Sequence, residues 1–254
     1  MIKQVLKLRM ANHVNWRFEN ILSFIKTIVS GNDLDKVGRK YGTDKVGSHF
    51  YLPHYQSHFK KFRFKKFNLL EIGVGGYADP SAGGESLRMW KRYFPFAKIF
   101  SIDIYDKSSL QESRIRIFKG SQVDEKLLND ISTRIDGWDI IIDDGSHLNY
   151  QVIESFKILF PKLNDGGIYV IEDTQTSYWE NFGGDSENLN NPKTAANFFK
   201  GLTDSLNHKE FIIRNYKPSY YDQKIVSIHF YHNLIFIYKG NNDEESNIVV
   251  NNQK

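Results

Sequence analysis

The sequence predicts an α/β fold in which helices cover both faces of a doubly wound, mostly parallel sheet. Short apolar runs that end in acidic residues or glycine alternate along the chain with helical patterns. Near-continuous apolar strands with helices between them are typical of a parallel sheet buried on both faces. We expect strands at residues 67–73, 97–104, 114–118, 138–143 and 167–173, and helices at 85–94, 124–135 and 150–163.

The C-terminal part of the chain predicts a different local arrangement. Residues 191–207 have a helical pattern, and three apolar runs follow it, at 210–216, 225–231 and 234–239. His232 and Asn233 separate the last two runs and form a turn signal. We therefore expect a terminal antiparallel hairpin, followed by a polar, flexible tail at 241–254.

The N-terminal region predicts a helix outside the main domain. Its apolar residues recur at helical spacing from Phe18 to Val29, and the segment SGND at 30–33 ends the pattern. A helix of this kind most often packs on a partner subunit or covers a cleft, and we expect a homo-oligomer formed through it. The chain then divides into a helical extension at 1–37, a main domain at 38–240 and the tail.

Composition excludes several classes of site. The 254 residues contain no cysteine, which excludes disulfides, thiolate metal sites and cysteine nucleophiles. No apolar run reaches the roughly 18 residues that a membrane span needs, and no signal-peptide core follows the basic start. We therefore expect a cytoplasmic protein without a membrane span.

Charge is distributed unevenly along the chain. Residues 1–67 hold 14 Lys and Arg against 4 Asp and Glu, whereas the remainder holds 20 against 26. The basic region predicts either attraction of an anionic acceptor or a solvated helical face that balances the acidic part. Aromatic residues interleave the basic ones at 49–67, but no recognised RNA- or DNA-binding motif accompanies them, so we expect no nucleic-acid partner.

A glycine-rich turn follows the first predicted strand, in LLEIGVGGY. Gly73 and Gly75 allow the backbone to turn tightly and approach a ligand closely. Glu71 suits a cationic cofactor better than a pyrophosphate, and Asp103 at the next strand end can accept hydrogen bonds from both hydroxyls of a ribose. These features favour S-adenosylmethionine. The alternatives are a dinucleotide, because GxGxxA fits a loose fingerprint, or a plain tight turn with a surface acid.

Three further residues extend this cofactor hypothesis. Ser121 and Gln122 follow the third strand, where folds of this type line the adenine; an ordinary loop with Gly120 as its turn residue is the alternative. Tyr77 either covers the cofactor or contacts the acceptor.

Two neighbouring predicted strands each end in a pair of acidic residues. The first pair begins the motif DDGSH. Carboxyl ends of parallel strands meet at one edge of the sheet, so Asp144, His147, Glu172 and Asp173 are expected to share one cavity. Like charges this close cost energy unless a metal ion, a cationic cofactor, a helix N-terminus or solvent offsets them, and carboxylates without cysteine suit Mg²⁺, Mn²⁺ or Ca²⁺. The alternative is an Asx turn or helix cap, with Ser146 as N-cap.

Several long motifs, in this order, resemble the class I, metal-dependent sugar O-methyltransferases. They are GTDK, LLEIGVGGY, GGESLRMWKRYFP, IFSIDIYDK, DIIIDDGSH, GGIYVIEDTQTSYW and IHFYHNLIFIYKG. The resemblance covers residues 38–240 and implies a Rossmann-like fold with a mostly parallel seven-stranded sheet. Members of this family with a larger N-terminal region methylate deoxysugars on macrolide antibiotics.

The resemblance also implies roles for individual residues. Asp144, Glu172 and Asp173 would bind a divalent cation, usually Mg²⁺, and His147 would act as general base. By this pattern, Thr43 and Asp44 in GTDK would bind the cofactor, and Asp143 would lie on the cofactor side. Tyr178 and Trp179 would line the acceptor pocket. A turn at Thr43 and Asp44, and core packing of Tyr178 and Trp179, are the alternatives.

The sequence therefore predicts a metal-assisted O-methyltransferase that uses S-adenosylmethionine. Its expected acceptor is a sugar hydroxyl of a glycan, for which a bacterial surface polysaccharide precursor is our first choice, or of a glycosylated small molecule. Three alternatives stay open: a phosphate or phosphoramidate-type oxygen as acceptor, an NAD-dependent oxidoreductase, and a non-catalytic scaffold.

Overall fold

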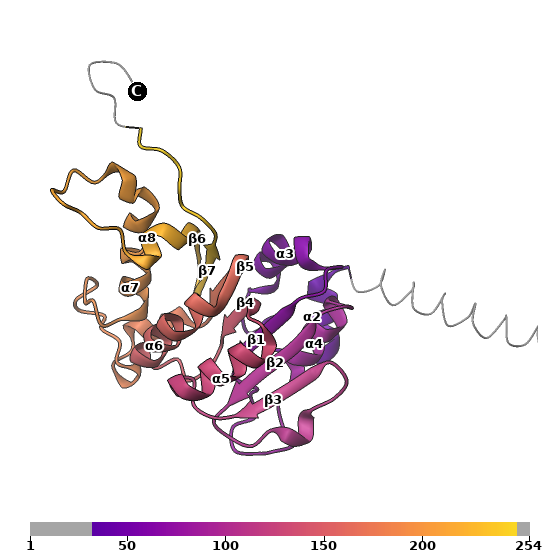
Figure 1. Ribbon diagram of the computed structural model, residues 1–254. Coiled ribbons are helices and arrows are strands. Elements are labelled where there is room, and N and C mark those ends of the chain that lie inside the picture. Colours follow the sequence, from indigo (N-terminus) through magenta and orange to yellow (C-terminus); the bar gives the residue numbers. More distant parts are fainter. Residues whose placement is uncertain (1–31, 248–254) are drawn as a thin grey trace, which may run out of the picture.

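A single seven-stranded sheet forms the centre of the molecule (Figure 1). The computed structural model describes residues 32–247, and every structural statement concerns this part of the chain. The sheet order is β3-β2-β1-β4-β5-β7-β6. The strands are β1 (Asn68–Ile72), β2 (Lys98–Asp103), β3 (Ile115–Lys119), β4 (Trp138–Asp143), β5 (Leu163–Ile171), β6 (Ile225–Tyr231) and β7 (Leu234–Lys239).

The first five strands are parallel, and β7 pairs antiparallel with both β5 and β6. This confirms the predicted mostly parallel sheet with a terminal hairpin, whose turn holds Asn233 at a φ of 60°. The run at 210–216 forms no strand, although it is apolar. Its amides bond within local turns, as from Tyr216 N to Ile213 O, and Ile212 is 93% exposed.

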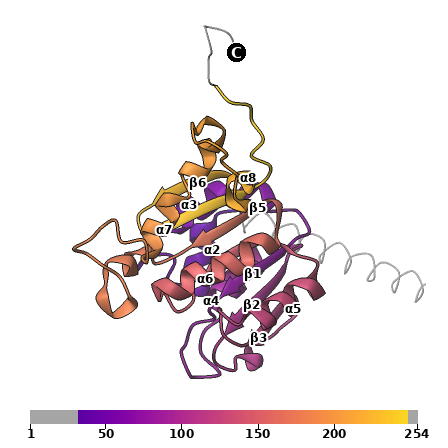
Figure 2. The same cartoon turned by 60° about the vertical axis from the view of Figure 1, so that its left-hand side comes forward.

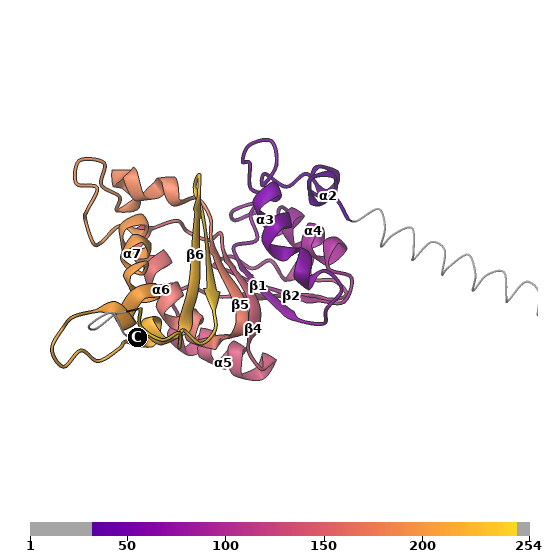
Figure 3. The same ribbon diagram turned by 90° about the horizontal axis from the view of Figure 1, so that it is seen from above.

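Helices cover both faces of the sheet (Figures 2 and 3). One face carries three helices, and the other carries four. The first group is α2 (Leu34–Tyr41), α3 (Leu52–Phe59) and α4 (Glu85–Tyr93); the second is α5 (Glu125–Ile135), α6 (Asn149–Leu159), α7 (Ala195–Gly201) and α8 (Tyr220–Lys224).

Two predicted helices are shorter than their sequence patterns. The helix expected at 150–163 ends at Leu159, because Pro161 cannot continue it, and a 3-10 turn over Phe160–Lys162 leads directly into β5. The helix expected at 191–207 is divided: α7 ends at Gly201, and a separate 3-10 segment covers Asp204–Glu210. The chain therefore leaves its helical path after Leu159 and again after Gly201, before it reaches the hairpin.

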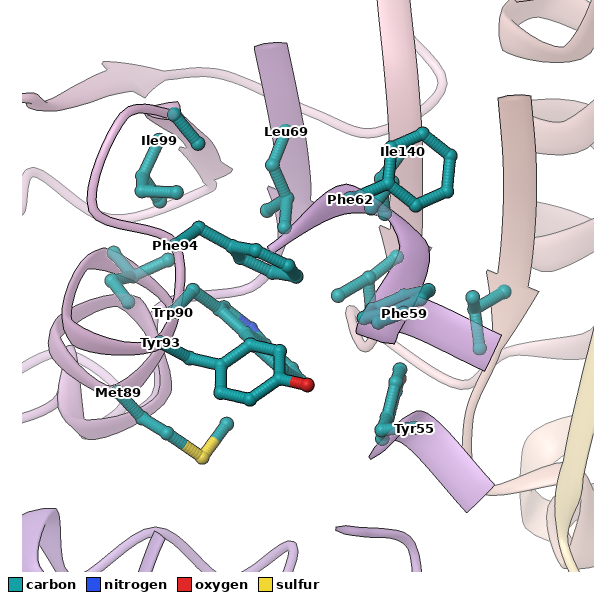
Figure 4. Close-up of a cluster of buried hydrophobic side chains, with 14 of the residues drawn as sticks. Tyr55, Phe59, Phe62, Leu69, Met89, Trp90, Tyr93, Phe94, Ile99 and Ile140 are labelled. Atoms are coloured by element: carbon teal, nitrogen blue, oxygen red, sulfur yellow. The ribbon is translucent and has the colours of Figure 1, made fainter. Parts of the chain in front are cut away.

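Aromatic side chains fill the core under α3 and α4 (Figure 4). Tyr55 and Phe59 of α3 contact Trp90 of α4, with ring centroids 5.0 and 5.7 Å apart. All three side chains are buried. Because α3 packs this tightly, the residues just before it are held in place against the carboxyl ends of the strands.

The predicted N-terminal helix, and the homo-oligomer expected through it, lie outside the described residues. The helix α2 runs across residues 37 and 38, where the sequence placed the start of the main domain, and Leu34 and Val37 are buried in the core. Within the described residues, no helix combines the length and the hydropathy needed to cross a membrane.

His58 of α3 predicts a measurable acid sensitivity of the fold. Its ring bonds to Tyr238 and Tyr231, and burial, with the nearby His229, lowers its pKa from 6.5 to about 4. Between these values the unfolded chain binds a proton that the folded chain does not, so the stability that His58 contributes is lost as pH falls from 6.5 to 4. His58→Gln should flatten the pH dependence of the free energy of unfolding in this window, measured by urea denaturation.

The control for this prediction is His232→Gln, because His232 is exposed in the hairpin turn. That variant should keep the slope of the wild-type protein. If the free energy of unfolding of His58→Gln and of the wild-type protein changed equally with pH, His58 would not be the source of the acid sensitivity.

Candidate functional site

The two adjacent aspartates of DDGSH lie on opposite faces of the sheet. Asp143 ends β4 beside Ile72 and Ile171, and side chains alternate between faces along a strand. Asp143 therefore points to the face of α6, and Asp144 points to the face of α3. The crowding of two like charges that the sequence suggested is resolved by the pleat of the strand.

Asp143 lies in a closed polar pocket below α6. Its side chain accepts hydrogen bonds from Ser155 Oγ at 2.5 Å and Gln122 Nε2 at 3.2 Å. Gln122 Oε1 in turn accepts from the amide of Ser146. Burial raises the pKa of Asp143 to about 6. The residue was expected to face a bound cofactor, but it is 1% exposed and instead ties α6 to the DDGSH loop.

A buried lysine lies on the other face, between three carboxylates. Lys45 Nζ is 2.5 Å from Asp144 Oδ2, 2.7 Å from Glu172 Oε1 and 3.3 Å from Glu71 Oε1. The Lys45 side chain is 1% exposed. Tyr55 donates a hydrogen bond to Glu172 Oε1 from below. The Glu71 carboxylate is buried, and the ammonium group of Lys45 is its main counter-charge.

The charges in this cluster shift each other's pKa values. Burial lowers the pKa of Lys45, but the carboxylates outweigh burial and hold it well above its ordinary value. Burial raises the pKa of Glu71 to about 7 and, together with the charge of Asp144, raises that of Glu172. One ammonium group thus faces three carboxylates, and the cluster favours additional positive charge.

A second group of ligand atoms lies nearer the solvent. His147 Nε2 is 3.9 Å from Asp144 Oδ1 and 3.6 Å from Asp173 Oδ2. Burial opposes the charged form of Asp173, but a hydrogen bond from Tyr51 Oη at 2.6 Å and the nearby histidines give it a lowered pKa. His147 and Asp173 both have a positive φ, 57° and 53°, a strained backbone conformation that costs about 1–3 kcal/mol.

The predicted metal ligands are divided between these two groups. In each group the ligand atoms lie within 4.8 Å of one another: Asp144 with His147 and Asp173, and Asp144 with Glu71 and Glu172. Asp144 belongs to both. Glu172 and Asp173 are neighbours in the sequence, but they are not members of a common group. A cation shared by all three predicted ligands would therefore require side-chain adjustment from the described geometry.

The glycine turn lies directly beside this acidic edge. Gly73 has a φ of 94°, and a Cβ atom there would overlap the carbonyl oxygen of Asp144. Gly75 also has a positive φ. Asp103 holds the turn from β2, because its Oδ2 accepts the Val74 amide at 2.9 Å. Glu71, for which the sequence predicts a cofactor contact, is 0% exposed, and its Oε1 lies 3.3 Å from Lys45 Nζ.

The other predicted site residues differ in how far they are buried near the carboxyl edge of the sheet. Thr43 is buried, whereas Asp44 is exposed; the turn that they form leads into Lys45. Ser121 Oγ accepts the Val123 amide in an ordinary loop turn. Tyr77, Tyr178 and Trp179 are 89%, 47% and 49% exposed, so core packing does not account for them. Leu148 rather than Ser146 is the N-cap of α6.

The sequence interpretation missed three residues of this site: Lys45, Tyr51 and Tyr55. Their contacts with Asp144, Glu172 and Asp173 span 99 to 127 positions of the chain, so local patterns do not predict them. The signals available were the position of Lys45 within GTDK and the spacing of four between Tyr51 and Tyr55, which places two tyrosines on one face of a helix.

Comparison with known proteins relates the chain to two sugar O-methyltransferases. It is 46% identical over 214 residues to mycinamicin VI 2''-O-methyltransferase from Micromonospora griseorubida, covering 84% of this chain and 54% of that protein. It is 44% identical over 210 residues to 8-demethyl-8-alpha-L-rhamnosyl tetracenomycin-C 2'-O-methyltransferase from Streptomyces olivaceus, covering 82% and 55%. The chain spans about half the length of these relatives.

A solved structure agrees with these relatives. MycE methyltransferase from the mycinamycin biosynthetic pathway, in complex with Mg and SAH, superposes with a TM-score of 0.81 at 46% identity. The match covers 84% of this chain and 56% of that one. The chain matches none of the protein-family models.

Lys45→Met should strongly destabilise the metal-free protein. Removal of the ammonium leaves Glu71, Asp144 and Glu172 without their common counter-charge, and breaking a buried charge cluster costs about 3–5 kcal/mol. Urea denaturation at pH 8 would measure the loss. Lys36→Met is the control, because the Lys36–Asp33 pair is exposed and its removal should cost about 0–1 kcal/mol. Equal stability of the two variants would contradict this role of Lys45.

Proposed function

We propose that this chain is an S-adenosylmethionine-dependent O-methyltransferase of the class I sugar O-methyltransferase type, because it is 44–46% identical to sugar O-methyltransferases over most of its length. The proposed acceptor is a sugar hydroxyl, and a divalent cation, preferably Mg²⁺, assists the transfer. The relatives are named for glycosylated small molecules. We therefore favour such an acceptor over the surface polysaccharide precursor that was our first choice from the sequence.

One observation carries the proposal: an imidazole and two carboxylates meet at the carboxyl edge of the sheet, beside the glycine turn. His147 Nε2 lies within 4 Å of both Asp144 and Asp173. A sugar hydroxyl is a very weak acid at neutral pH, so its methylation needs a base at the reacting oxygen. A neutral imidazole at this position is suited to that role.

The donor set also fits a hard divalent cation. Asp144, Glu172 and Asp173 offer carboxylate oxygens, and the cluster has more negative than positive charge. When bound, S-adenosylmethionine supplies an activated methyl group, and the cation lowers the pKa of the acceptor hydroxyl. This chain's residues supply the remainder: His147 accepts the proton at Nε2, and the nearby carboxylates of Asp144 and Asp173 favour its charged form.

The cofactor would lie over the glycine turn. Gly73 lets the backbone approach closely, and Asp103 is half-buried at the end of β2. Its oxygens accept the amides of Val74 and Tyr105, and each keeps a further acceptor site for a ribose hydroxyl. The exposed rings of Tyr178 and Trp179 lie on the segment that follows Asp173 and are candidates for contact with the sugar.

His147→Ala should reduce kcat for methylation of a sugar hydroxyl by about 10²–10⁴-fold, the usual effect of removing a general base. Methyl transfer from labelled S-adenosylmethionine to a panel of glycosylated small molecules would measure it. His49→Ala is the matched control, because His49 Nδ1 is also close to Asp173, at 3.7 Å.

The pattern of these two variants identifies the base. A large loss in His49→Ala with little loss in His147→Ala would reassign the role. Little loss in either variant would favour an acceptor oxygen that is already ionised, such as a phosphate.

Binding of the nucleoside cofactor is a separate prediction. S-adenosylhomocysteine should raise the melting temperature of the protein, whereas NAD should leave it unchanged, because Asp103 and the glycine turn bind the nucleoside and the acidic edge disfavours a pyrophosphate. Differential scanning fluorimetry with each compound at equal concentration tests this. Stabilisation by NAD alone would contradict the proposal and favour an oxidoreductase.

A further inference from the structure

We propose that residues 45–55, the donor segment, determine which oxygen of each metal-ligand carboxylate stays free to bind the cation. This inference rests on the proposed function, because it concerns the same three carboxylates. Lys45, Tyr51 and Tyr55 act in it as positioning residues, through Asp144, Glu172 and Asp173 and without contact to the reacting atoms.

The donor segment engages one oxygen of every proposed ligand. Lys45 Nζ binds Asp144 Oδ2 at 2.5 Å and Glu172 Oε1 at 2.7 Å. Tyr55 donates its hydroxyl hydrogen to the same Glu172 Oε1. Tyr51 donates to Asp173 Oδ1 at 2.6 Å. Each of the three carboxylates therefore has one oxygen bound at short distance by Lys45, Tyr51 or Tyr55.

The second oxygens of the two aspartates point toward the proposed base. Asp144 Oδ1 and Asp173 Oδ2 are the atoms that face His147 Nε2, at 3.9 and 3.6 Å. Glu172 reaches the same group of carboxylates through Asp144, whose ligand atoms lie within 4.8 Å of those of both Glu172 and Asp173. Two aspartate oxygens thus lie beside the proposed base, and Asp144 links them to Glu172.

The donors themselves have little freedom to move. Lys45, Tyr51 and Tyr55 are 1%, 2% and 0% exposed, and the Tyr51 amide bonds to the carbonyl of Lys45 at 3.2 Å. The two tyrosines stand four residues apart where α3 begins, so their hydroxyls point to the same side. Aromatic packing of Tyr55 against Trp90 fixes the ring.

This arrangement has a physical consequence for metal affinity. A carboxylate without an outer hydrogen-bond partner can rotate and must be ordered when the cation binds. Outer partners that fix the ligand orientation typically improve metal affinity about 10–100-fold. The donor segment therefore prepares the site before any cation arrives.

Tyr51→Phe and Tyr55→Phe test this directly. Each removes one hydroxyl and keeps the ring, so we expect the Kd for Mn²⁺ to rise about 10-fold or more. Free Mn²⁺ counted by electron paramagnetic resonance in titrations of the full chain measures affinity without requiring turnover. Lys45 is not used for this measurement, because its removal also changes the charge of the site.

Tyr216→Phe is the matched control. Tyr216 Oη donates to Asp222 Oδ2 at 2.6 Å, the same distance as Tyr51 to Asp173, and Asp222 belongs to neither group of candidate metal ligands among the described residues. This variant should keep the wild-type Kd for Mn²⁺. A merely structural role of Tyr51 and Tyr55 would make all three variants behave alike.

The outcomes separate this inference from the proposed function. If the wild-type protein binds no Mn²⁺, the metal-assisted function fails. If the wild-type protein binds Mn²⁺ and both Tyr51→Phe and Tyr55→Phe keep a Kd within about threefold of Tyr216→Phe, the inference is overturned while the function stands. If Tyr55→Phe does not fold, Tyr51→Phe alone decides between these results.

Discussion

The ammonium group of Lys45 allows two acidic side chains to be buried at the end of the sheet, beside the partly exposed Asp144. Isolated carboxylates cannot be desolvated at acceptable cost, and Glu71 and Glu172 are 0% and 3% exposed. Lys45 contacts both, together with Asp144. Because one positive charge does not neutralise three negative ones, the cluster stays attractive to a further cation. The stability of the buried carboxylates and the affinity of the cluster for a cation therefore both depend on the contacts of Lys45 with these carboxylates.

The pleat of the strands divides the polar residues into two systems. Glu71, Asp144 and Glu172 point to the side of α3, whereas Asp143 points to the side of α6. The α3 side concentrates charge and opens toward His147. On the α6 side, Asp143 and Gln122 hold the DDGSH loop. One system is suited to chemistry and the other to keeping the loop in place.

The aromatic core contributes to the site through α3. Tyr55 contacts Trp90 and Phe59 with its ring and Glu172 with its hydroxyl. A single side chain thus joins hydrophobic packing to the orientation of a proposed metal ligand. Interiors are close-packed, so movement of α3 would displace the carboxylates as well as the core. This coupling explains how a segment about a hundred residues away in sequence can shape the acidic edge.

The amino-acid sequence predicted the α/β class, the hairpin and the acidic strand ends, because apolar periodicity and turn residues are local signals. It also predicted that Asp144 and His147 would lie near Asp173, since parallel strand ends share an edge. The burial of Glu71 and Asp143, and the contacts of Lys45, Tyr51 and Tyr55 with the carboxylates, follow from the tertiary structure. The contacts with Asp144, Glu172 and Asp173 join positions 99 to 127 residues apart, and no local pattern encodes which distant donor a carboxylate will meet.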